Sequence, residues 1–301
     1  MSVYHQPVML TESIEGLNIK PEGVYVDVTF GGGGHAAAIA AKLKTGKLFG
    51  FDQDKAAQMN IDKIIQSTFT LIPANFRHMK KYLKAYGVNK VDGVLADLGI
   101  SSYQIDTPER GFSTRFEATL DMRMNQESPL TAGAIIDQYE EGQLQKVFSQ
   151  YGEVRNAKTL ASSIVRERAV EPIRTIDRLK SILTKLAPRG RHNKYFAQVF
   201  QALRIEVNDE LKALQELLLQ CSYVVAKGGR LVVISYHSLE DRLVKNFMNN
   251  GNFFEGPVKD FYGNQERPFR PVIRKPIRAT AAEIADNSRA RSAKLRIAEK
   301  L

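Results

Sequence analysis

A buried strand, four consecutive glycines and an alanine-rich helix follow one another near the start of this chain. The strand is the apolar, β-branched run at 24–30, the glycines occupy 31–34, and the segment 35–43 favours a helix. Glycine lets a backbone approach a ligand closely, and the first turn of a helix presents free N–H groups. This order predicts a nucleotide-binding loop, with a glycine turn that holds no ligand as the alternative.

Strand and helix patterns alternate through the rest of the first hundred residues. Further strands are predicted at 48–52, 70–74 and 91–99, with helices at 54–66 and 75–86. Strands separated by helices of this length indicate a parallel sheet that is covered on both faces. The pattern returns late in the chain, with strands predicted at 230–235, 253–256 and 294–299, and a helix at 238–250 that begins with a capping box from Ser238 to Asp241.

The segment between these two parts has almost no strand pattern. Helices are predicted there at 140–151, 156–169, 175–187 and 193–203. We therefore predict an α/β fold in two domains. A Rossmann-like sheet domain is formed by 1–103 together with 206–301, and an all-helical domain is inserted at 104–205.

The charge of the chain is positive and unevenly distributed. The formal net charge is +10, and the stretch from Arg178 to Arg204 contains seven Lys or Arg residues and no acid. Within it, Arg189, Arg191 and Lys194 stand beside three aromatic residues, a combination that favours RNA, whose phosphates bind cations and whose bases stack on rings. The alternative is a solvated loop before an amphipathic helix whose aromatic side chains face the core.

A second basic stretch runs from Arg267 to Arg278 and contains Arg270 and Arg274. It is predicted to be either a second phosphate-binding arm or a surface crossover to the last strand. The sequence has no apolar run long enough to span a bilayer and no signal-peptide pattern, so we expect a cytoplasmic protein with no membrane partner. The single cysteine, Cys221, excludes an intrachain disulfide.

Three polar residues follow predicted strands and are candidates for the site. Asp52 stands 21 residues after Gly31, where a carboxylate accepts hydrogen bonds from ribose hydroxyls, as in sites for dinucleotides and equally for S-adenosylmethionine (AdoMet). Asp97 ends the fourth strand, where an acidic side chain can accept from an amine that attacks a sulfonium methyl group, with a residue that caps a turn as the alternative. His237 is a candidate general base or base-contacting group, with a capping or packing histidine as the alternative. We expect no metal site.

Seven blocks of sequence, in order, resemble the bacterial small-subunit (16S) ribosomal RNA cytosine-N4 methyltransferase family. The blocks are TFGGGGH (29–35), LADLGISSYQID (95–106), ERGFS (109–113), LDMRM (120–124), the YF-Q-FQALRI-VN pattern (195–208), SYHSLEDR (235–242) and RARSAKLR (289–296). The resemblance runs from His5 to the C-terminus. It implies a class I methyltransferase sheet with an inserted helical domain for RNA recognition, and direct transfer of methyl from AdoMet to N4 of a cytosine in the decoding region of 16S ribosomal RNA.

The resemblance also implies roles for particular residues. The cofactor contacts carried over are Gly33, Gly34 and His35 in the loop, Asp52 on the ribose, Phe76 beside the adenine, and Asp97 and Gln104. The expected partner is the small ribosomal subunit or its RNA, and a homodimer is left open. The motif Asp97-Leu98-Gly99-Ile100 lacks the prolines of DNA amino-methyltransferases. The alternatives are an RNA-binding or ribosome-assembly factor without activity, and an NAD-dependent oxidoreductase.

Overall fold

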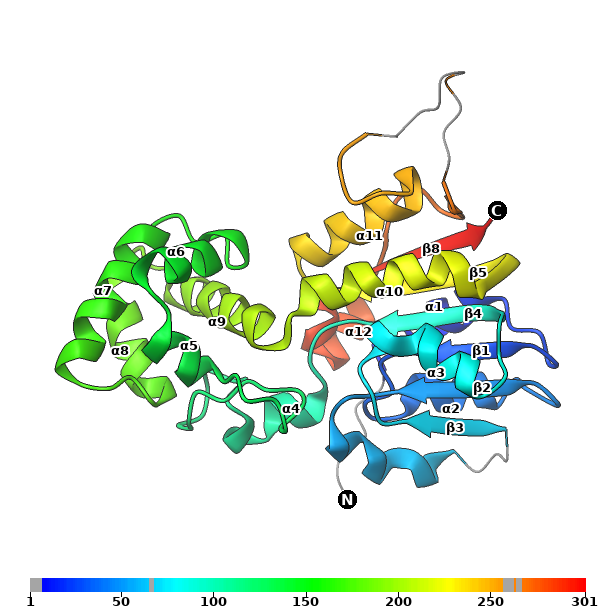
Figure 1. Cartoon of the computed structure of the whole chain (residues 1–301), viewed down its shortest axis with the longest axis horizontal. Helices are drawn as coiled ribbons and strands as arrows, with labels where there is room; N and C mark the ends of the chain where they lie inside the picture. Colours follow the sequence, from blue (N-terminus) through cyan, green and yellow to red (C-terminus); the bar gives the residue numbers. More distant parts are fainter. Residues whose placement is uncertain (1–6, 65–67, 257–262, 264–266) are drawn as a thin grey trace. The chain divides into compact units, whose positions relative to one another are not determined.

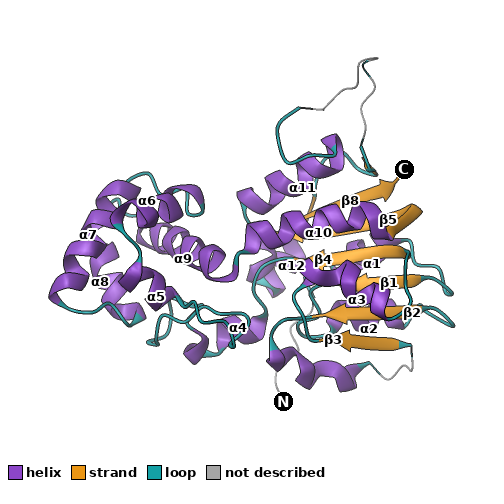
Figure 2. Cartoon of the chain, viewed as in Figure 1, coloured by secondary structure: helices purple, strands orange, loops and turns teal. Residues whose placement is uncertain are grey.

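The computed structural model of the chain describes residues 7–64, 68–256, 263 and 267–301. Two compact units are present. The sheet unit comprises residues 1–99 and 211–301, and the helical unit comprises residues 100–210. Figures 1 and 2 show the order of their elements.

The helical unit begins four residues earlier and ends five residues later than we predicted. Its late end has a clear cause, because Asn208 donates to the carbonyl of Met122 and accepts from the amide of Met124. Arg204 also pairs with Glu210 through two hydrogen bonds of 2.8 and 3.0 Å. These contacts attach the last residues of the segment to the helical unit.

Eight strands form one sheet among the described residues of the sheet unit, in the order β3-β2-β1-β4-β5-β8-β6, with β7 also paired to β8. The strands from β3 to β5 are parallel, and β6, β7 and β8 are antiparallel to their neighbours. Their bounds are β1 Val24–Asp27, β2 Lys47–Phe51, β3 Phe69–Ile72, β4 Val91–Asp97, β5 Val225–Ser235, β6 Phe269–Pro271, β7 Ile277–Arg278 and β8 Lys294–Lys300. The predicted doubly wound sheet is confirmed.

Helices cover both faces of this sheet. Neighbouring residues of β5 alternate between the two apolar layers, with Leu231 and Val233 in one and Val232 and Ile234 in the other. The first layer includes side chains of α3, α10 and α11, and the second includes side chains of α1 and α2. The helices are α1 Leu10–Leu17, α2 Gly34–Ala40, α3 Met79–Ala85, α10 Glu210–Val224, α11 Ser238–Asn250 and α12 Ala281–Asp286, with 3₁₀ segments Lys55–Lys63, Phe76–His78 and Ser288–Ser292.

Three local predictions in the sheet unit are wrong. The predicted helix at 54–66 is a 3₁₀ segment, Lys55–Lys63. The predicted strand at 253–256 is irregular, because α11 ends at Gly251 with φ +75° and Phe253 then folds back to stack on Phe247, with ring centroids 5.5 Å apart. The capping box of α11 starts at His237 rather than at Ser238.

The helical unit has its own apolar core. Its helices are α4 Ser102–Asp106, α5 Ala132–Gln138, α6 Glu141–Gln150, α7 Ala157–Val170, α8 Ile176–Leu186 and α9 His192–Asn208, with a 3₁₀ turn at Pro108–Arg110. The four predicted helices are confirmed as α6 to α9. Fully buried Leu160, Leu179, Val199 and Leu203 lie in one cluster with side chains of α5 and α6. No helix among the described residues of either unit has the length and apolarity that a membrane crossing requires.

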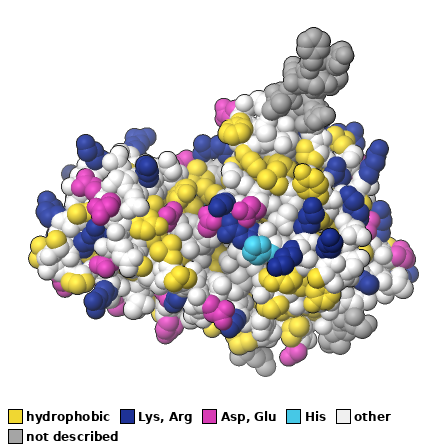
Figure 3. All heavy atoms as spheres, viewed as in Figure 1, with side chains coloured by type: hydrophobic (Ala, Val, Ile, Leu, Met, Phe, Trp, Pro, Cys, Tyr) yellow, Lys and Arg dark blue, Asp and Glu magenta, His cyan; other side chains and the backbone are white. Residues whose placement is uncertain are grey.

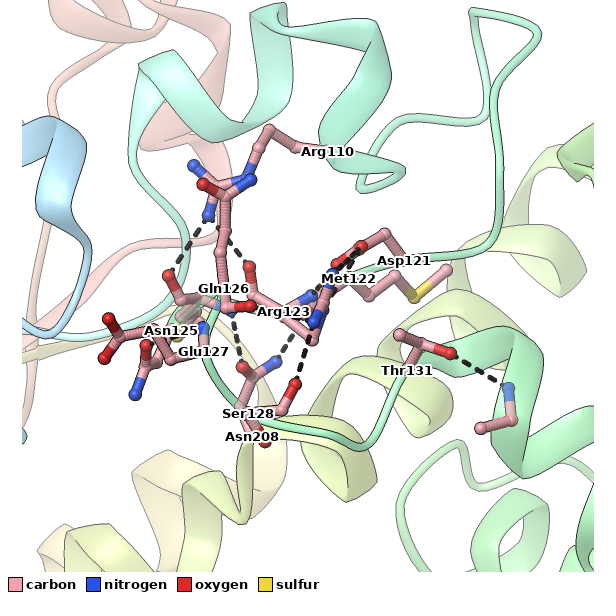
Figure 4. Close-up of polar contacts among 12 residues, drawn as sticks. Arg110, Asp121, Met122, Arg123, Asn125, Gln126, Glu127, Ser128, Thr131 and Asn208 are labelled. Atoms are coloured by element: carbon pink, nitrogen blue, oxygen red, sulfur yellow. Dashed lines mark hydrogen bonds and ion pairs between the residues drawn. The ribbon is translucent and has the colours of Figure 1, made fainter.

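Two arginines hold the loop that precedes α5 (Figure 4). Buried Arg110 donates to the carbonyls of Arg123 and Met124, at 2.8 and 3.1 Å. Arg123 pairs with Asp121 and also donates to the carbonyls of Gln126 and Ser128. The guanidinium groups thus satisfy backbone carbonyls that a loop without regular structure would leave unpaired, so the LDMRM block has a structural use.

Candidate active site

The glycine loop lies at the carboxyl end of β1, next to β4. The chain leaves β1 for β2 and β3 on one side and returns to β4 on the other, so β1 and β4 flank the point where strand order reverses. Ligands of doubly wound sheets bind at this point. Gly33 adopts φ +78°, and a Cβ at Gly34 would collide with the ring of Pro7. Both positions therefore favour glycine, and α2 begins at the second of them, Gly34.

Asp52 follows β2 and holds the glycine loop. Its Oδ2 accepts from the amide of Gly31 at 2.8 Å, and its Oδ1 accepts from the amide of Asp54 at 2.8 Å. The residue is half-buried. A carboxylate oxygen can accept more than one hydrogen bond, so Asp52 can both position the loop and accept from a ligand.

His35 in the first turn of α2 is buried and neutral. Its Nε2 lies 3.1 Å from the carbonyl oxygen of Val8, and burial lowers the pKa of the ring. Because a carbonyl oxygen can only accept, Nε2 carries the hydrogen and Nδ1 is left as an acceptor. Nδ1 lies 3.9 Å from Oδ2 of Asp97, so the two acceptors face one space.

Asp27, at the end of β1, is a fully buried carboxyl group that we did not single out from the sequence. Its Oδ1 accepts from the amide of Thr29 at 3.1 Å, but its buried Oδ2 has no hydrogen-bond partner among the described residues. Burial raises the pKa of Asp27 to about 6, although His35 and Thr29 act in the opposite direction. A signal was available, since Asp27 is the one charged residue of the predicted strand 24–30.

Asp97 ends β4 and bonds to Tyr236, which follows β5. The phenol donates to Oδ1 of Asp97 at 2.7 Å, and the amide of Asp97 donates to Oγ1 of Thr29 at 2.7 Å. Burial raises the pKa of Asp97 to about 7, and the hydrogen bond from Tyr236 opposes that rise. Among the described residues, no hydrogen bond to Oδ2 of Asp97 is present, and Nδ1 of His35 lies 3.9 Å from it. One carboxylate oxygen is therefore left for a ligand.

His237 lies one residue beyond Tyr236 but does not reach Asp97 by any described contact. It is the N-cap of α11, where Nδ1 accepts from the amide of Glu240 at 3.4 Å and Nε2 lies 3.2 Å from Oε1 of the same residue. Glu240 is thus the described residue in contact with the ring on both sides, through its amide and its carboxylate. The capping alternative describes His237 better than the role of general base, and Tyr236 is the residue of this block that sequence reasoning missed.

Phe76 follows β3, the strand next to the one that Asp52 follows. It starts the 3₁₀ turn after β3, is half-buried, and packs against the apolar layer of β1 and β2. The amide of Asp52 donates to the carbonyl of Ile72 at 3.3 Å, and Asn75 donates to Gln53 at 2.8 Å. These bonds place the segment before Phe76 beside the segment that carries Asp52.

The remaining predicted residues occupy several places. Gln104 belongs to the helical unit, is buried, and completes a capping box with Ser101 at the start of α4.

Arg189, Arg191 and Lys194 are exposed around the start of α9. Arg270 on β6 pairs with Glu299 at 3.2 Å, whereas Arg274 is exposed. Cys221 is buried in α10, and burial raises the pKa of its thiol far above the ordinary value.

The described site thus combines a glycine loop with several acceptors at one sheet edge. The acceptors are Asp27, Asp52, Asp97 and the Nδ1 of His35. Such a set suits a ligand that carries a ribose and a cationic amine, and Asp97 can also take up a proton near neutral pH because its pKa is about 7.

Comparison with known proteins gives close relatives. The profile of the MraW methylase family matches residues 2–301. A protein of Cytophaga hutchinsonii named ribosomal RNA small subunit methyltransferase H is 59% identical over 298 residues, covering 99% of this chain and 100% of the relative. A protein of the same name from Flavobacterium johnsoniae is 54% identical over 299 residues, covering 99% and 98%. The solved structure of TrmN from Thermus thermophilus is 10% identical with a TM-score of 0.44, over 97% of this chain and 48% of that one.

Proposed function

Because this chain belongs to the MraW methylase family, we propose that it transfers the methyl group of AdoMet to the exocyclic N4 of a cytosine in the decoding region of 16S ribosomal RNA. The observation that carries the proposal is the family match over residues 2–301, together with Asp97 at the sheet edge where such a reaction needs an acceptor. The family assignment leaves the NAD-dependent oxidoreductase without support. The reaction would take place in the cytoplasm, on the small subunit or its RNA.

AdoMet fits the residues that are present. The glycine loop after β1 would lie against the cofactor, and Asp52, which holds that loop through Gly31, would accept from the ribose hydroxyls. Phe76 would lie beside the adenine. The buried, unpartnered Oδ2 of Asp27 and the Nδ1 of His35 would accept from the α-ammonium group. When bound, AdoMet supplies a methyl group on a positively charged sulfur atom.

Asp97 would handle the amine of the cytosine. Its Oδ2 accepts one N4–H, which favours the pyramidal nitrogen whose lone pair can attack in line. As N4 forms its bond to the methyl carbon, the carbon–sulfur bond breaks and its electron pair stays on sulfur. N4 then releases one proton, which the carboxylate of Asp97 takes up before passing it to solvent. This path needs no thiol adduct, in keeping with the burial of Cys221.

RNA contacts are proposed for the exposed cations. Arg189, Arg191 and Lys194 would bind phosphates of the substrate, and Arg274 would add a contact from the sheet unit. Arg270 already forms an ion pair with Glu299, so we expect it to contribute less to RNA affinity than Arg274 does. Gln104 caps α4 together with Ser101, and we propose that it contacts AdoMet in addition. A homodimer remains an expectation.

The test is a labelling experiment. The chain is incubated with tritiated AdoMet and with small subunits from cells that lack this activity, and the label is mapped by nuclease digestion and nucleoside analysis. We expect label in N4-methylcytidine at one position of the decoding region. Binding of AdoMet and of subunits without any label would favour the non-catalytic assembly factor, and label on carbon 5 would contradict the in-line route to N4.

A further inference from the structure

Two basic segments of the helical unit that are far apart in sequence lie side by side. One comprises Arg155, just before α7, and Lys158 in its first turn, and the other is the loop before α9 with its first turn, which carry Arg189, Arg191 and Lys194. All five side chains are exposed. We call these five residues the basic patch.

Asn156 joins the two segments. Its Nδ2 donates to the carbonyl of Leu186 at 3.2 Å, and its Oδ1 accepts from the hydroxyl of Tyr195 at 3.0 Å. Gln198, one turn further along α9, donates to the carbonyl of Gly152 at 3.0 Å. The chain before α7 is therefore held along the first turns of α9, and Arg155 and Lys158 flank the loop that carries Arg189 and Arg191.

The charges of the basic patch are not neutralised within the chain. None of its five residues forms an ion pair with a described residue, and no acid occurs in 155–158 or 186–194, the nearest in sequence being Glu153. Neighbouring cations of the same unit are paired, since Arg178 and Lys185 contact Glu167. On the face drawn in Figure 3, basic side chains of the helical unit likewise stand among acidic ones. The two segments thus bring five cations together with no acid in 155–158 or 186–194, an arrangement that suits a polyanion.

The aromatic residues of this region point inward. Tyr195 is 4% exposed and its hydroxyl is bonded to Asn156, and Phe200 is 6% exposed. Phe196 packs against the apolar core, with the ring of His192 at its edge. The alternative in which the aromatic side chains of this stretch face the core is therefore confirmed. What faces solvent is cationic, and cations bind phosphates of any sequence.

We propose that the basic patch holds the phosphodiester backbone of the RNA substrate without reading its bases. This inference rests on the proposed function, which identifies the RNA as 16S ribosomal RNA. It adds Arg155 and Lys158 to the RNA-binding residues and assigns sequence recognition to groups outside the basic patch.

The test measures the salt dependence of RNA binding by the full chain in the absence of AdoMet. The probes are a 20-nucleotide RNA with the decoding-region sequence and a scrambled RNA of the same composition. We expect R155Q and K158Q each to lower the slope of log affinity against log salt by about 0.7–0.9, equally for both probes.

R174Q is the matched control. Arg174 is exposed in the same unit but lies beyond the far end of α7, whose 14 residues extend roughly 21 Å. Its loss should leave the slope unchanged. The proposal would be overturned if R155Q, K158Q and R174Q all gave the same slope. It would also be overturned if R155Q and K158Q weakened binding of the decoding-region RNA but not of the scrambled RNA. Because this measurement needs no methyl transfer, failure of the labelling experiment would leave its outcome interpretable.

Discussion

The phenol of Tyr236 donates a 2.7 Å hydrogen bond to Oδ1 of Asp97, although the two residues are 139 positions apart in the chain. The bond connects the ends of β5 and β4, and it leaves Oδ2 of Asp97 facing His35. Tyr236 therefore positions the proposed acceptor and stabilises its charged form. Glu240 and Asp27 are the other acidic groups near this pair, and Glu283 also acts on Tyr236.

Replacing Tyr236 by phenylalanine should move the pH profile of methyl transfer. A hydrogen bond to the charged form lowers the pKa of Asp97, so its loss raises that pKa above about 7. Hydrogen bonds to charged groups contribute about 1.5–3 kcal/mol, which corresponds to a shift of about one to two pH units. The acid limb of kcat/KM for Y236F should move up by that amount, with activity recovered at high pH. Superimposable profiles would show that Tyr236 does not act on the titrating group.

Replacing Asp97 by asparagine should abolish proton uptake while it keeps the shape of the side chain. Loss of a general base costs about 10²–10⁴ in rate, so we expect kcat of D97N to fall within that range. The dissociation constant for AdoMet, measured by calorimetry, should change by a much smaller factor because the glycine loop and Asp52 are intact. A D97N variant with near-normal kcat at neutral pH would remove Asp97 from the chemistry.

Replacing Asp52 by alanine should weaken AdoMet binding for two reasons. The variant loses the acceptor for ribose, and it releases the amide of Gly31 that Oδ2 holds at 2.8 Å. At about 1.5–3 kcal/mol for a hydrogen bond to a charged group, the dissociation constant should rise about 10- to 100-fold. E22A serves as control, because exposed Glu22 precedes β1 at the opposite edge of the sheet. Equal effects of D52A and E22A would count against a site at the carboxyl edge.

Asp27 should make the free protein less stable at neutral pH than at mildly acidic pH. Its pKa is about 6 in the folded chain and about 3.8 in the unfolded chain, so the folded state binds more protons between these values. Stability therefore falls as pH rises from about 4 to 6, by roughly 3 kcal/mol at 1.36 kcal/mol per unit. D27N should unfold at a higher denaturant concentration than the parent at pH 7.5, with the difference shrinking toward pH 4.5.

The same D27N variant should bind AdoMet more weakly, since an amide is a poorer partner for an ammonium group than a carboxylate. Calorimetry at pH 7.5 measures this loss. A D27N chain that is no more stable at pH 7.5, or that binds AdoMet as well as the parent, would show that the buried carboxylate is not kept for the ligand.

Much of the fold was predictable because its signals are local. Apolar runs such as 24–30 and 230–235 become central strands, since a parallel strand buried on both faces needs apolar residues at successive positions. Where a local prediction was wrong, contacts with distant residues or between competing neighbours determined the conformation. The segment 253–256 turns back onto Phe247 instead of extending the sheet, and His237 rather than Ser238 caps α11.

The sequence by itself determined the order of elements, the glycine loop and the positions of Asp52 and Asp97 at strand ends, because each follows from residues within a few positions of one another. Only the tertiary structure decided which groups meet there. Strand order brings Tyr236 to Asp97, and the hydrogen bond from Tyr195 to Asn156 brings the first turn of α9 to the residues just before α7. Such contacts depend on register and packing between segments tens of residues apart, which local patterns do not encode.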